Sequence, residues 1–524
     1  MKPRLSYLLI SGIIILLIFS GIYIWRNKHL KQIPKFNEQS FNAPISCKYI
    51  PINSDLVFHW KINPTILPKY MENYQDKVNK RISFIRDSAF QLISLDFAKD
   101  ISKWAGDYGS FAVVDSNKKH LNDWIMVLGI QDDVNIEEEL ESILEKNVME
   151  ESIDSRQRLK TSSSTGIISK KINSNNSIYF AKEKDNVLIS SSPEIIKSSL
   201  DQSVIDRLNT KENYKNIQLM ENLKDGLLLL EISPKKIFNL IGQEDNLLGL
   251  NEIKNLITSI NIDKNTLNLE GIISYDAKIP MPSSDINYKL IDMKKESQVS
   301  NDFILIDEPN QYFGNGSNHP YQKLIASIIQ KSTTSDYSNL FKIILEHSKG
   351  NLLWINDKDW LVLTRKSDTS KKEISNILNK ENFLNSNLEF QNRKLEVWSN
   401  ISTIDNEKYE IKENIEAIFE EEQGNYIWGQ SIFPISNIDN IKYLPNYLDS
   451  DQTTDEINDF NEILRIHLGK EKADTILNTF YPYILFKMML GNKLNPPQNI
   501  DISIAVPTIN YPDFIKFKIN LQTS

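Results

Sequence analysis

Six histidines and one cysteine are the residues of this chain that most readily do chemistry, and their spacing argues against a metal site. The chain has 524 residues, and its single thiol is Cys47. No two histidines stand three or four positions apart, whereas zinc sites built from histidine need such pairs or a matching set of cysteines. The histidines are His29, His59, His120, His319, His347 and His467.

Motifs for nucleophilic catalysis and for nucleotide binding are also missing from the sequence. It contains no Gly-x-Ser-x-Gly elbow, no P-loop and no glycine cluster of the dinucleotide-binding type. Acidic runs such as Glu137–Glu139 are typical of solvated helix faces. We therefore expect no metal ion, no cofactor and no enzymatic activity.

The segment Trp104-Ala-Gly-Asp-Tyr-Gly109 is the best local candidate for a binding site. Its aromatic rings and the Asp107 carboxylate are suited to line a ligand groove. The same residues also fit a structural role, in which Gly106 and Gly109 permit a tight turn, Asp107 accepts hydrogen bonds from turn amides and Trp104 fills the core. We favour the structural interpretation and keep the ligand groove as the alternative.

An Asp-Trp pair occurs twice, as Asp123-Trp124 and as Asp359-Trp360, each time at the start of an apolar run. In the structural interpretation the aspartate caps a turn, and the tryptophan begins a buried strand while its indole N–H finds an acceptor. The complete set of candidates for ligand contact or turn formation is Trp104, Gly106, Asp107, Asp123, Trp124, Asp359 and Trp360.

Short strands and amphipathic helices must position these residues. Both Asp-Trp pairs open short apolar runs of the kind that form strands, and residues 136–148 carry apolar side chains at helical spacing. Residues 257–263 and 266–275 alternate, and Asp263-Lys-Asn265 between them predicts a hairpin turn. These patterns predict an α+β fold of mostly antiparallel sheets with packed helices.

The second half of the chain repeats the order of the first. Four pairs of segments align with a nearly constant offset, which is the mark of a repeated unit. The pairs are 109–114 with 350–355, 123–128 with 359–364, 140–144 with 374–378, and 257–275 with 502–521. We predict an internal duplication, with a first α+β repeat at 45–280 and a second at 296–524.

The segment from Leu5 to Trp25 contains no charged residue and is largely apolar. It is long enough for one helical crossing of the hydrocarbon core of a bilayer. Its length and the lack of a small-residue cleavage site favour an uncleaved anchor over a signal peptide. We predict a transmembrane anchor at 1–30 and a linker at 31–44, with the lipid bilayer as a partner. Basic residues on both sides of the segment leave its topology open.

Composition limits the other partners. The formal net charge is -9, with 40% hydrophobic and 25% charged residues, as in an ordinary folded protein of weakly acidic character. A chain without a basic face does not attract the phosphate backbone, so we expect no nucleic acid partner.

Several motifs together resemble an uncharacterised, mainly cyanobacterial family of single-pass membrane proteins that carry a domain of unknown function. The motifs are Pro51-Ile-Asn-Ser-Asp-Leu-Val57, Asp100-Ile-Ser-Lys-Trp-Ala-Gly-Asp107, the strand that begins at Asp123-Trp124, and the N-terminal apolar segment. The resemblance implies an extracytoplasmic body, periplasmic or lumenal. It supplies no reaction, ligand or catalytic residue.

The sequence leaves three functional hypotheses. The first is a membrane-anchored, non-enzymatic binding or scaffolding protein of the cell envelope or thylakoid, with a groove between its two repeats for an envelope protein or lipid. The second is a carrier of lipid or another hydrophobic ligand in envelope biogenesis, with the strands at 267–273 and 514–521 lining a cavity. The third is a hydrolase whose catalytic residues are scattered along the chain.

Overall fold

The structure is a computed structural model that describes most of the chain after residue 43. The predicted anchor and nearly all of the predicted linker lie outside the described residues, as does the segment between the two predicted repeats. Within the described residues, no helix combines the length and the apolar character that a membrane crossing requires. The described ranges are 44–51, 53–64, 83–84, 86–88, 90–91, 95–114, 123–132, 134–145, 159–160, 166–173, 176–204, 223, 226–233, 253–263, 266–279, 302–313, 319–333, 339–356, 359–406, 408–422, 424–432, 460–479, 497–507 and 513–522.

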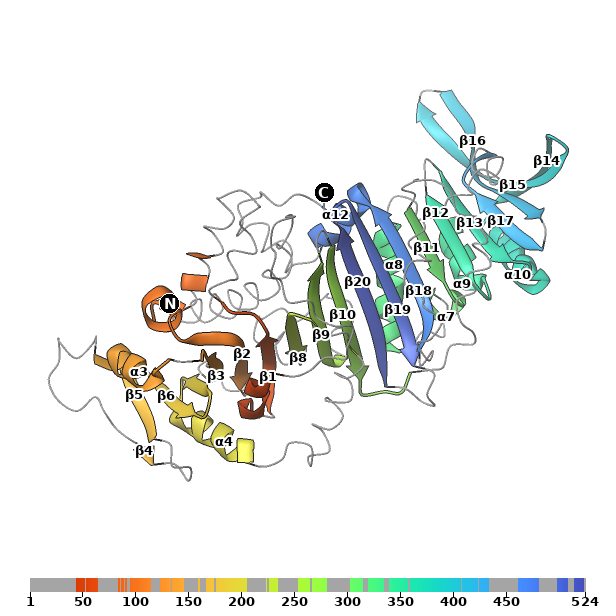
Figure 1. Cartoon of the computed structure of the whole chain (residues 1–524). Helices are drawn as coiled ribbons and strands as arrows, with labels where there is room; N and C mark the ends of the chain where they lie inside the picture. Colours follow the sequence, from red (N-terminus) through yellow and green to blue (C-terminus); the bar gives the residue numbers. More distant parts are fainter. Residues whose placement is uncertain are drawn as a thin grey trace.

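Antiparallel strands dominate the fold and form a sheet on which the helices pack (Figure 1). The predicted α+β class is therefore confirmed. Every strand pairing in the described part of the chain is antiparallel. From one edge to the middle, the strands are β4 (Leu159–Lys160), β5 (Gly166–Asn173), β6 (Asn176–Glu183), β7 (Asn186–Ser190), β3 (Trp124–Ile130), β2 (Ala105–Val114), β1 (Ser54–Trp60), β8 (Leu228–Ile232), β9 (Ile253–Asp263) and β10 (Thr266–Tyr275).

The sheet continues beyond β10 through the strands of the second half. They are, in spatial order, β20 (Phe514–Gln522), β19 (Asn499–Pro507), β18 (Phe460–Gly469), β11 (Asp302–Ile306), β12 (Leu352–Asn356), β13 (Trp360–Arg365), β17 (Asn425–Gly429), β16 (Lys408–Glu422), β15 (Arg393–Asn406) and β14 (Leu384–Phe390).

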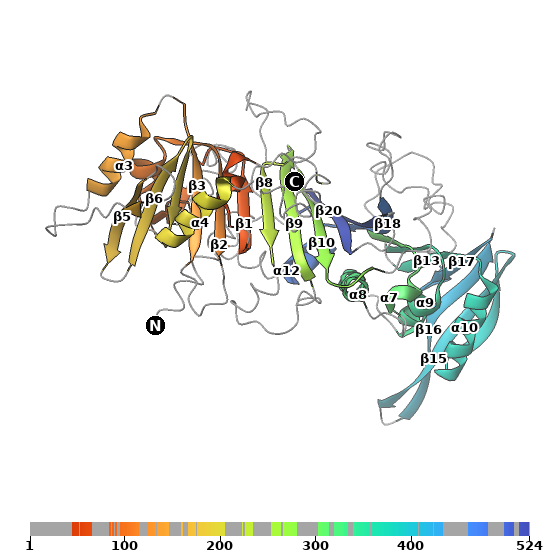
Figure 2. The same cartoon turned by 90° about the horizontal axis from the view of Figure 1, so that it is seen from below.

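The described strands of the two halves follow the same spatial order, because each strand of the first half has a counterpart numbered ten higher at the equivalent place. The two orders meet at β10 and β20, which pair antiparallel from Thr266 opposite Gln522 to Ser274 opposite Phe514. Equivalent strands that pair antiparallel are related by an approximate two-fold axis, which passes through this joint. In both views the green strands β9 and β10 stand beside the blue strand β20 (Figures 1 and 2), and Figure 1 shows β19 next to β20.

The segments that align in sequence occupy equivalent places in the two halves. They lie in β2 and β12, in β3 and β13, in helices α3 (Ile136–Glu145) and α10 (Asp368–Lys380), and in the hairpins β9–β10 and β19–β20. The predicted hairpin at Asp263-Lys-Asn265 is confirmed, since Asp263 lies opposite Thr266. The helix predicted at 136–148 is described as far as Glu145.

Pleating gives the sheet two faces, because successive side chains of a strand point to opposite sides. Face A carries His59, Glu270 and Leu305, and face B carries Trp60, Ile273 and Ile304. The largest hydrophobic cluster lies on face B. In the first half, a second cluster on face A packs under α4 (Pro193–Val204) and the short 3-10 helix η1 (Ile45–Tyr49).

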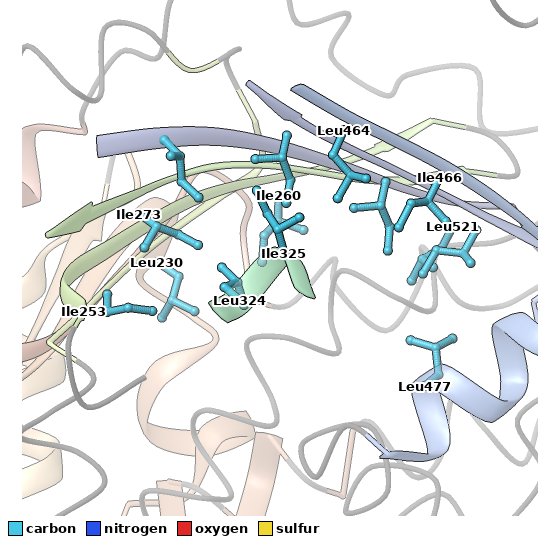
Figure 3. Packing of buried hydrophobic residues seen from close by; sticks show 14 of the residues in the cluster. Leu230, Ile253, Ile260, Ile273, Leu324, Ile325, Leu464, Ile466, Leu477 and Leu521 are labelled. Carbon is cyan, nitrogen blue, oxygen red and sulfur yellow. The ribbon is translucent and has the colours of Figure 1, made fainter. Parts of the chain in front are cut away.

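Face B of the joint is a packed core. Ile325 of α8 (Pro320–Ser332) and Leu477 of α12 (Lys470–Thr479) lie against the strands on either side of β10 and β20, as Figure 3 shows. Ile515 is fully buried and Ile273 and Leu521 are nearly so. The apolar side chains proposed above for a cavity wall therefore contribute to helix–sheet packing at these positions. Further helices in the described part of the chain are the π-helix η3 (Phe97–Ile101), α7 (Asn310–Phe313) and α9 (Asn339–His347).

The start of α8 ties the two halves together. His319 caps this helix: its Nδ1 accepts a hydrogen bond from the Tyr321 backbone N–H at 3.2 Å, and Gln322 Oε1 accepts one from the His319 N–H at 3.0 Å. Pro320 occupies the first helical position, where its fixed φ suits a helix. The other ring nitrogen of His319 lies 3.3 Å from the carbonyl oxygen of Ala277, just beyond β10. The cap thus links the second half to the end of the first.

Candidate functional site

The segment Trp104–Gly109 does not form the tight turn expected from its glycines. Ala105–Gly109 is instead the first part of β2, with Ala105 opposite Ile130 and Gly109 opposite Leu128, so that β2 bulges between these pairs. Trp104 is fully buried, and its indole N–H donates to the Asp100 carbonyl oxygen at 2.5 Å. Asp107 is exposed. The tryptophan and the aspartate therefore do not line a common groove.

The glycines of this segment allow close approach of neighbouring groups. A Cβ placed on Gly109 would lie 2.3 Å from Cζ2 of Trp60, so the indole ring occupies the space that a side chain would need. A Cβ on Gly106 would lie 3.2 Å from the Ile130 carbonyl oxygen. Both glycines thus serve packing within the β1–β2–β3 part of the sheet.

The two Asp-Trp pairs have equivalent positions at the starts of β3 and β13. The Trp124 carbonyl accepts hydrogen bonds from Ser190 Oγ at 2.6 Å and from the Ser191 N–H at 3.3 Å. In the second half, the Trp360 carbonyl accepts a hydrogen bond from the Gln430 N–H at 3.0 Å. In each half the tryptophan backbone is therefore fastened by the residue that follows the neighbouring strand.

The side chains of these pairs contribute to packing and to local hydrogen bonds. Trp360 is buried against Phe341, with ring centroids 5.9 Å apart. Asp359 Oδ2 accepts a hydrogen bond from Ser431 Oγ at 2.5 Å, and the Asp123 carbonyl accepts one from the Val114 N–H at 2.8 Å. The candidates therefore lie at separate places, at the starts of β2, β3 and β13, and do not converge on one site.

A cluster of Cys47, His59, Ser110 and Ser46 lies on face A and was not foreseen as a unit. His59 Nδ1 lies 2.6 Å from Ser110 Oγ, which donates to Ser46 Oγ at 2.6 Å. Cys47 Sγ lies 3.3 and 3.5 Å from the two ring nitrogens of His59. Nearly equal distances to both nitrogens place the sulfur over the ring, whereas the nitrogens exchange protons in the ring plane. The cluster is thus a buried hydrogen-bonded chain with a thiol against it.

His59 and Trp60 are successive residues of β1, so their side chains point to opposite faces of the sheet. The structure buries both, at 4% and 9% exposure, because both faces of β1 are covered. The hydrogen-bond partners of His59 come from η1 and β2, and spacing along the chain gives no sign of either.

The central polar patch is the group of polar side chains on face A where the two halves meet. The strand register places them in rows: Ser259 lies opposite Glu270, Glu270 opposite Lys518, Lys518 opposite Ser503 and Ser503 opposite Arg465. The patch comprises Glu231, Asn255, Ser259 and Glu270 from the first half, and Glu462, Arg465, His467, Asp501, Ser503, Lys516 and Lys518 from the second.

Ion pairs join the charged members of this patch. Lys516 Nζ lies 2.6 Å from Glu270 Oε1, and this contact crosses the joint between β10 and β20. The contact pairs an ammonium with a carboxylate that is itself buried, so it is primarily electrostatic. Lys516 Nζ also lies 5.1 Å from the ring centroid of Phe460, an arrangement that favours the cation.

A second network occupies β18 and β19. Arg465 donates two hydrogen bonds to the Glu462 carboxylate, at 2.8 and 3.0 Å, and Ser503 Oγ donates to the same group at 2.6 Å. Such bidentate pairs are stronger and more directional than single contacts. Beside them, His467 Nδ1 lies 2.7 Å from Asp501 Oδ1, and the imidazole stacks on Phe303 with ring centroids 5.6 Å apart.

Pairing determines what this surface can do. A carboxylate held by a guanidinium or an ammonium is poorly placed to exchange protons with a substrate. A preformed array of both charge signs can instead accept a partner with the complementary pattern. The patch thus combines paired charges of both signs, some of them buried, as at Glu270 and His467, and some partly exposed, as at Arg465 and Asp501.

Fold and surface together define an α+β protein with a long antiparallel sheet, in which two like-ordered halves meet at a charged central face. The chain belongs to the family described as protein of unknown function (DUF3352), whose profile matches residues 8–523. A comparison with curated proteins gave no match.

Among solved structures, three crystal forms of TP0453 are similar to part of the chain. Forms IV, III and I share 10%, 11% and 12% sequence identity with it. They cover 43%, 48% and 48% of this chain, and 79%, 88% and 84% of their own. The TM-score is 0.26 in each case, which supports no conclusion about fold or function.

Proposed function

We propose that this protein is a membrane-tethered, non-enzymatic binding or scaffolding protein whose binding surface is the central polar patch. The observation that carries the proposal is the array of ion pairs on face A, with Glu270–Lys516 at 2.6 Å across the joint and Glu462–Arg465 at 2.8 Å within β18. An array of this kind offers fixed charges and hydrogen-bonding groups to a partner without any chemical step. The partner expected is a protein or headgroup that itself carries both signs of charge.

The tether is the apolar segment from Leu5 to Trp25, and the body is extracytoplasmic, periplasmic or lumenal, as in the mainly cyanobacterial single-pass family that the sequence resembles. Flanking basic residues and interfacial aromatic residues support an anchor of this kind. Alkaline carbonate extraction of membranes tests the tether. A protease-protection assay with a C-terminal tag tests the side on which the body lies.

We also propose that the two halves arose by duplication of one α+β unit, with repeats at 45–280 and 296–524. The like order of the strands and the paired tryptophans at β3 and β13 support this origin. The joint at β10 and β20 replaces the groove expected between repeats, because these strands pair directly. The partner would then lie on the face of the joint.

Affinity purification of the tagged full-length protein from detergent-solubilised membranes tests the binding function. Lys518→Glu reverses a charge in the middle of the patch, and Lys372→Glu on the exposed side of α10 makes the same change elsewhere. Quantitative mass spectrometry should show partners that are depleted at least tenfold by Lys518→Glu and retained by Lys372→Glu. Equal recovery with both variants, or no specific partner, contradicts the proposal. Copurified lipid without a protein partner instead favours the carrier hypothesis.

A further inference from the structure

The strand β14 forms an open edge of the sheet. In the described part of the chain it pairs with β15 alone. Every residue from Leu384 to Glu389 is exposed, and the side chains of Leu384 and Leu388 are among the exposed large hydrophobic groups, at 47% and 38%. At the equivalent place in the first half, the described residues of the edge strand β4 are Leu159–Lys160. The second half therefore presents a full-length edge strand, at the end of the molecule marked β14 in Figure 1.

This edge lacks the features that usually prevent strand association. Natural edge strands carry lysine, proline, bulges or inward-pointing charges, since unpaired backbone groups otherwise recruit another strand. The run Phe383–Leu388 contains no charged residue and no proline, and the register of β14 with β15 is unbroken. The only charge on the strand is Glu389.

The sequence of the edge reads the same in both directions: Leu384-Asn385-Ser386-Asn387-Leu388. An antiparallel pair formed by two copies of such a strand, centred on the serine, places residues of the same type opposite each other. We propose that β14 binds β14 of a second copy of this chain, so that a symmetric dimer forms around a two-fold axis at Ser386. A symmetric dimer requires a self-complementary surface of this kind.

The register of this dimer satisfies both faces of the strand. On one face, Leu384 lies opposite Leu388 of the partner subunit, and the reciprocal pair repeats the contact. On the other face, Asn385 lies opposite Asn387 of the partner subunit. Cross-strand pairs of these kinds stabilise a sheet, whereas like charges directly opposite each other destabilise it.

Charge also permits this register. Glu389 falls opposite Phe383 of the partner subunit, so the two copies bring no carboxylates face to face. The resulting joint repeats the geometry that the molecule already uses at β10 and β20, where equivalent strands pair antiparallel. One short strand per subunit is smaller than the roughly 800 Å² per partner of a standard interface. The dimer is therefore reversible and depends on concentration.

Site-directed cross-linking of the full-length protein in detergent tests the register. In a Cys47→Ser background, Ser386→Cys places two thiols directly opposite each other at the axis, within the Cα separation that a disulfide spans. Glu389→Cys is the matched control on the same exposed strand, because its two thiols would stand about 20 Å apart at about 3.3 Å per residue. Mild oxidation should cross-link Ser386→Cys at least tenfold more than Glu389→Cys. Equal cross-linking of both variants, or of neither, overturns the proposal.

Sedimentation of the full-length protein over a concentration series tests the association itself. Ser386→Lys places two ammonium groups at the axis and should raise the dimer dissociation constant at least tenfold. An equimolar mixture of Ser386→Lys and Ser386→Glu should restore association, and this rescue excludes misfolding of either variant as the cause. A wild-type protein that stays monomeric, or a mixture without rescue, contradicts the β14 dimer. Neither outcome bears on the central polar patch, so the two proposals fail independently.

Discussion

Substitution of Gly109 by alanine is the sharpest test of the packing that replaces the expected turn. The new Cβ would stand 2.3 and 2.5 Å from Cζ2 and Cε2 of Trp60, and 2.9 Å from the Val127 carbonyl oxygen. An ordinary van der Waals contact needs about 3.4 Å or more, so the indole must move by about 1 Å. It cannot do so freely, because Trp60 is 9% exposed within the main core. Overpacking of this kind costs about 1–3 kcal/mol, and we expect a value near the upper end.

Gly106→Ala is the matched control on the same strand. Its closest contact would be 3.2 Å, to the Ile130 carbonyl oxygen, which a small backbone adjustment relieves. We expect a loss of about 1 kcal/mol or less for this variant.

Urea denaturation of the full-length protein, followed by far-UV circular dichroism, measures both changes as shifts of the midpoint. Trp60→Leu removes the obstructing ring, so the double variant Trp60→Leu/Gly109→Ala should lose less stability than the sum of the single losses. Residues in contact show coupling of about 0.5–3 kcal/mol. Equal losses for the two alanine variants, or strict additivity in the double variant, would refute the packing argument and return the segment to consideration as a ligand site.

Three further predictions concern the joint and the cap of α8. Glu270→Leu and Lys516→Met should each destabilise the protein by about 2–3 kcal/mol, because each leaves a largely buried charge without its partner. In a double-mutant cycle measured by urea denaturation, the double variant should be at least about 1 kcal/mol more stable than the sum of the two single losses predicts. Additive losses would contradict the pairing. Burial raises the pKa of Tyr321 to about 12, above its ordinary value of about 10, so the native state holds this proton more tightly and the associated stability is complete below pH 10. That stability, about 2–3 kcal/mol, should be lost as the pH rises from 10 through 12, and urea midpoints measured across this range should fall less steeply for Tyr321→Phe. His319→Ala removes the acceptor at the start of α8 and should lower the free energy of unfolding by about 1 kcal/mol. His319→Asn restores a capping oxygen, so its melting temperature should return most of the way to that of the wild type. Equal melting temperatures for the two variants would exclude the cap.

Local patterns in the sequence predicted many of the elements. Alternation and apolar runs placed the hairpin at 257–275 and the strands that begin at Trp124 and Trp360, because these strands pair with neighbours close in sequence or bury continuous apolar segments. Helical spacing placed α3, since its apolar stripe is read within a few turns. The equivalence of segments in the two halves was also visible as an order of short matches.

The candidate site could not be predicted in the same way. Lys516, Lys518 and Glu270 were visible only as the polar positions of two alternating strands, for which solvent exposure is the simplest interpretation. Their meeting depends on the pairing of β10 with β20, and no local pattern specifies which edge of one half meets which edge of the other. The same holds for His59, whose partners are supplied by η1 and β2.

The turn expected at Gly106 failed for a related reason. A glycine indicates that a side chain has no room or that the backbone needs unusual freedom, and sequence does not distinguish the two. At Gly109 the first cause applies, because the Trp60 ring lies where the side chain would be.

The pairing of β10 with β20 has a consequence for biosynthesis. A ribosome completes the hairpin β9–β10 long before it reaches residues 514–522, so the nascent first half emerges with the free side of β10 uncovered. The strand that covers β10, β20, is synthesised only after nearly all of the second half has been translated. The free side of β10 should therefore need protection from other strands until Phe514–Gln522 has been made and can pair with it.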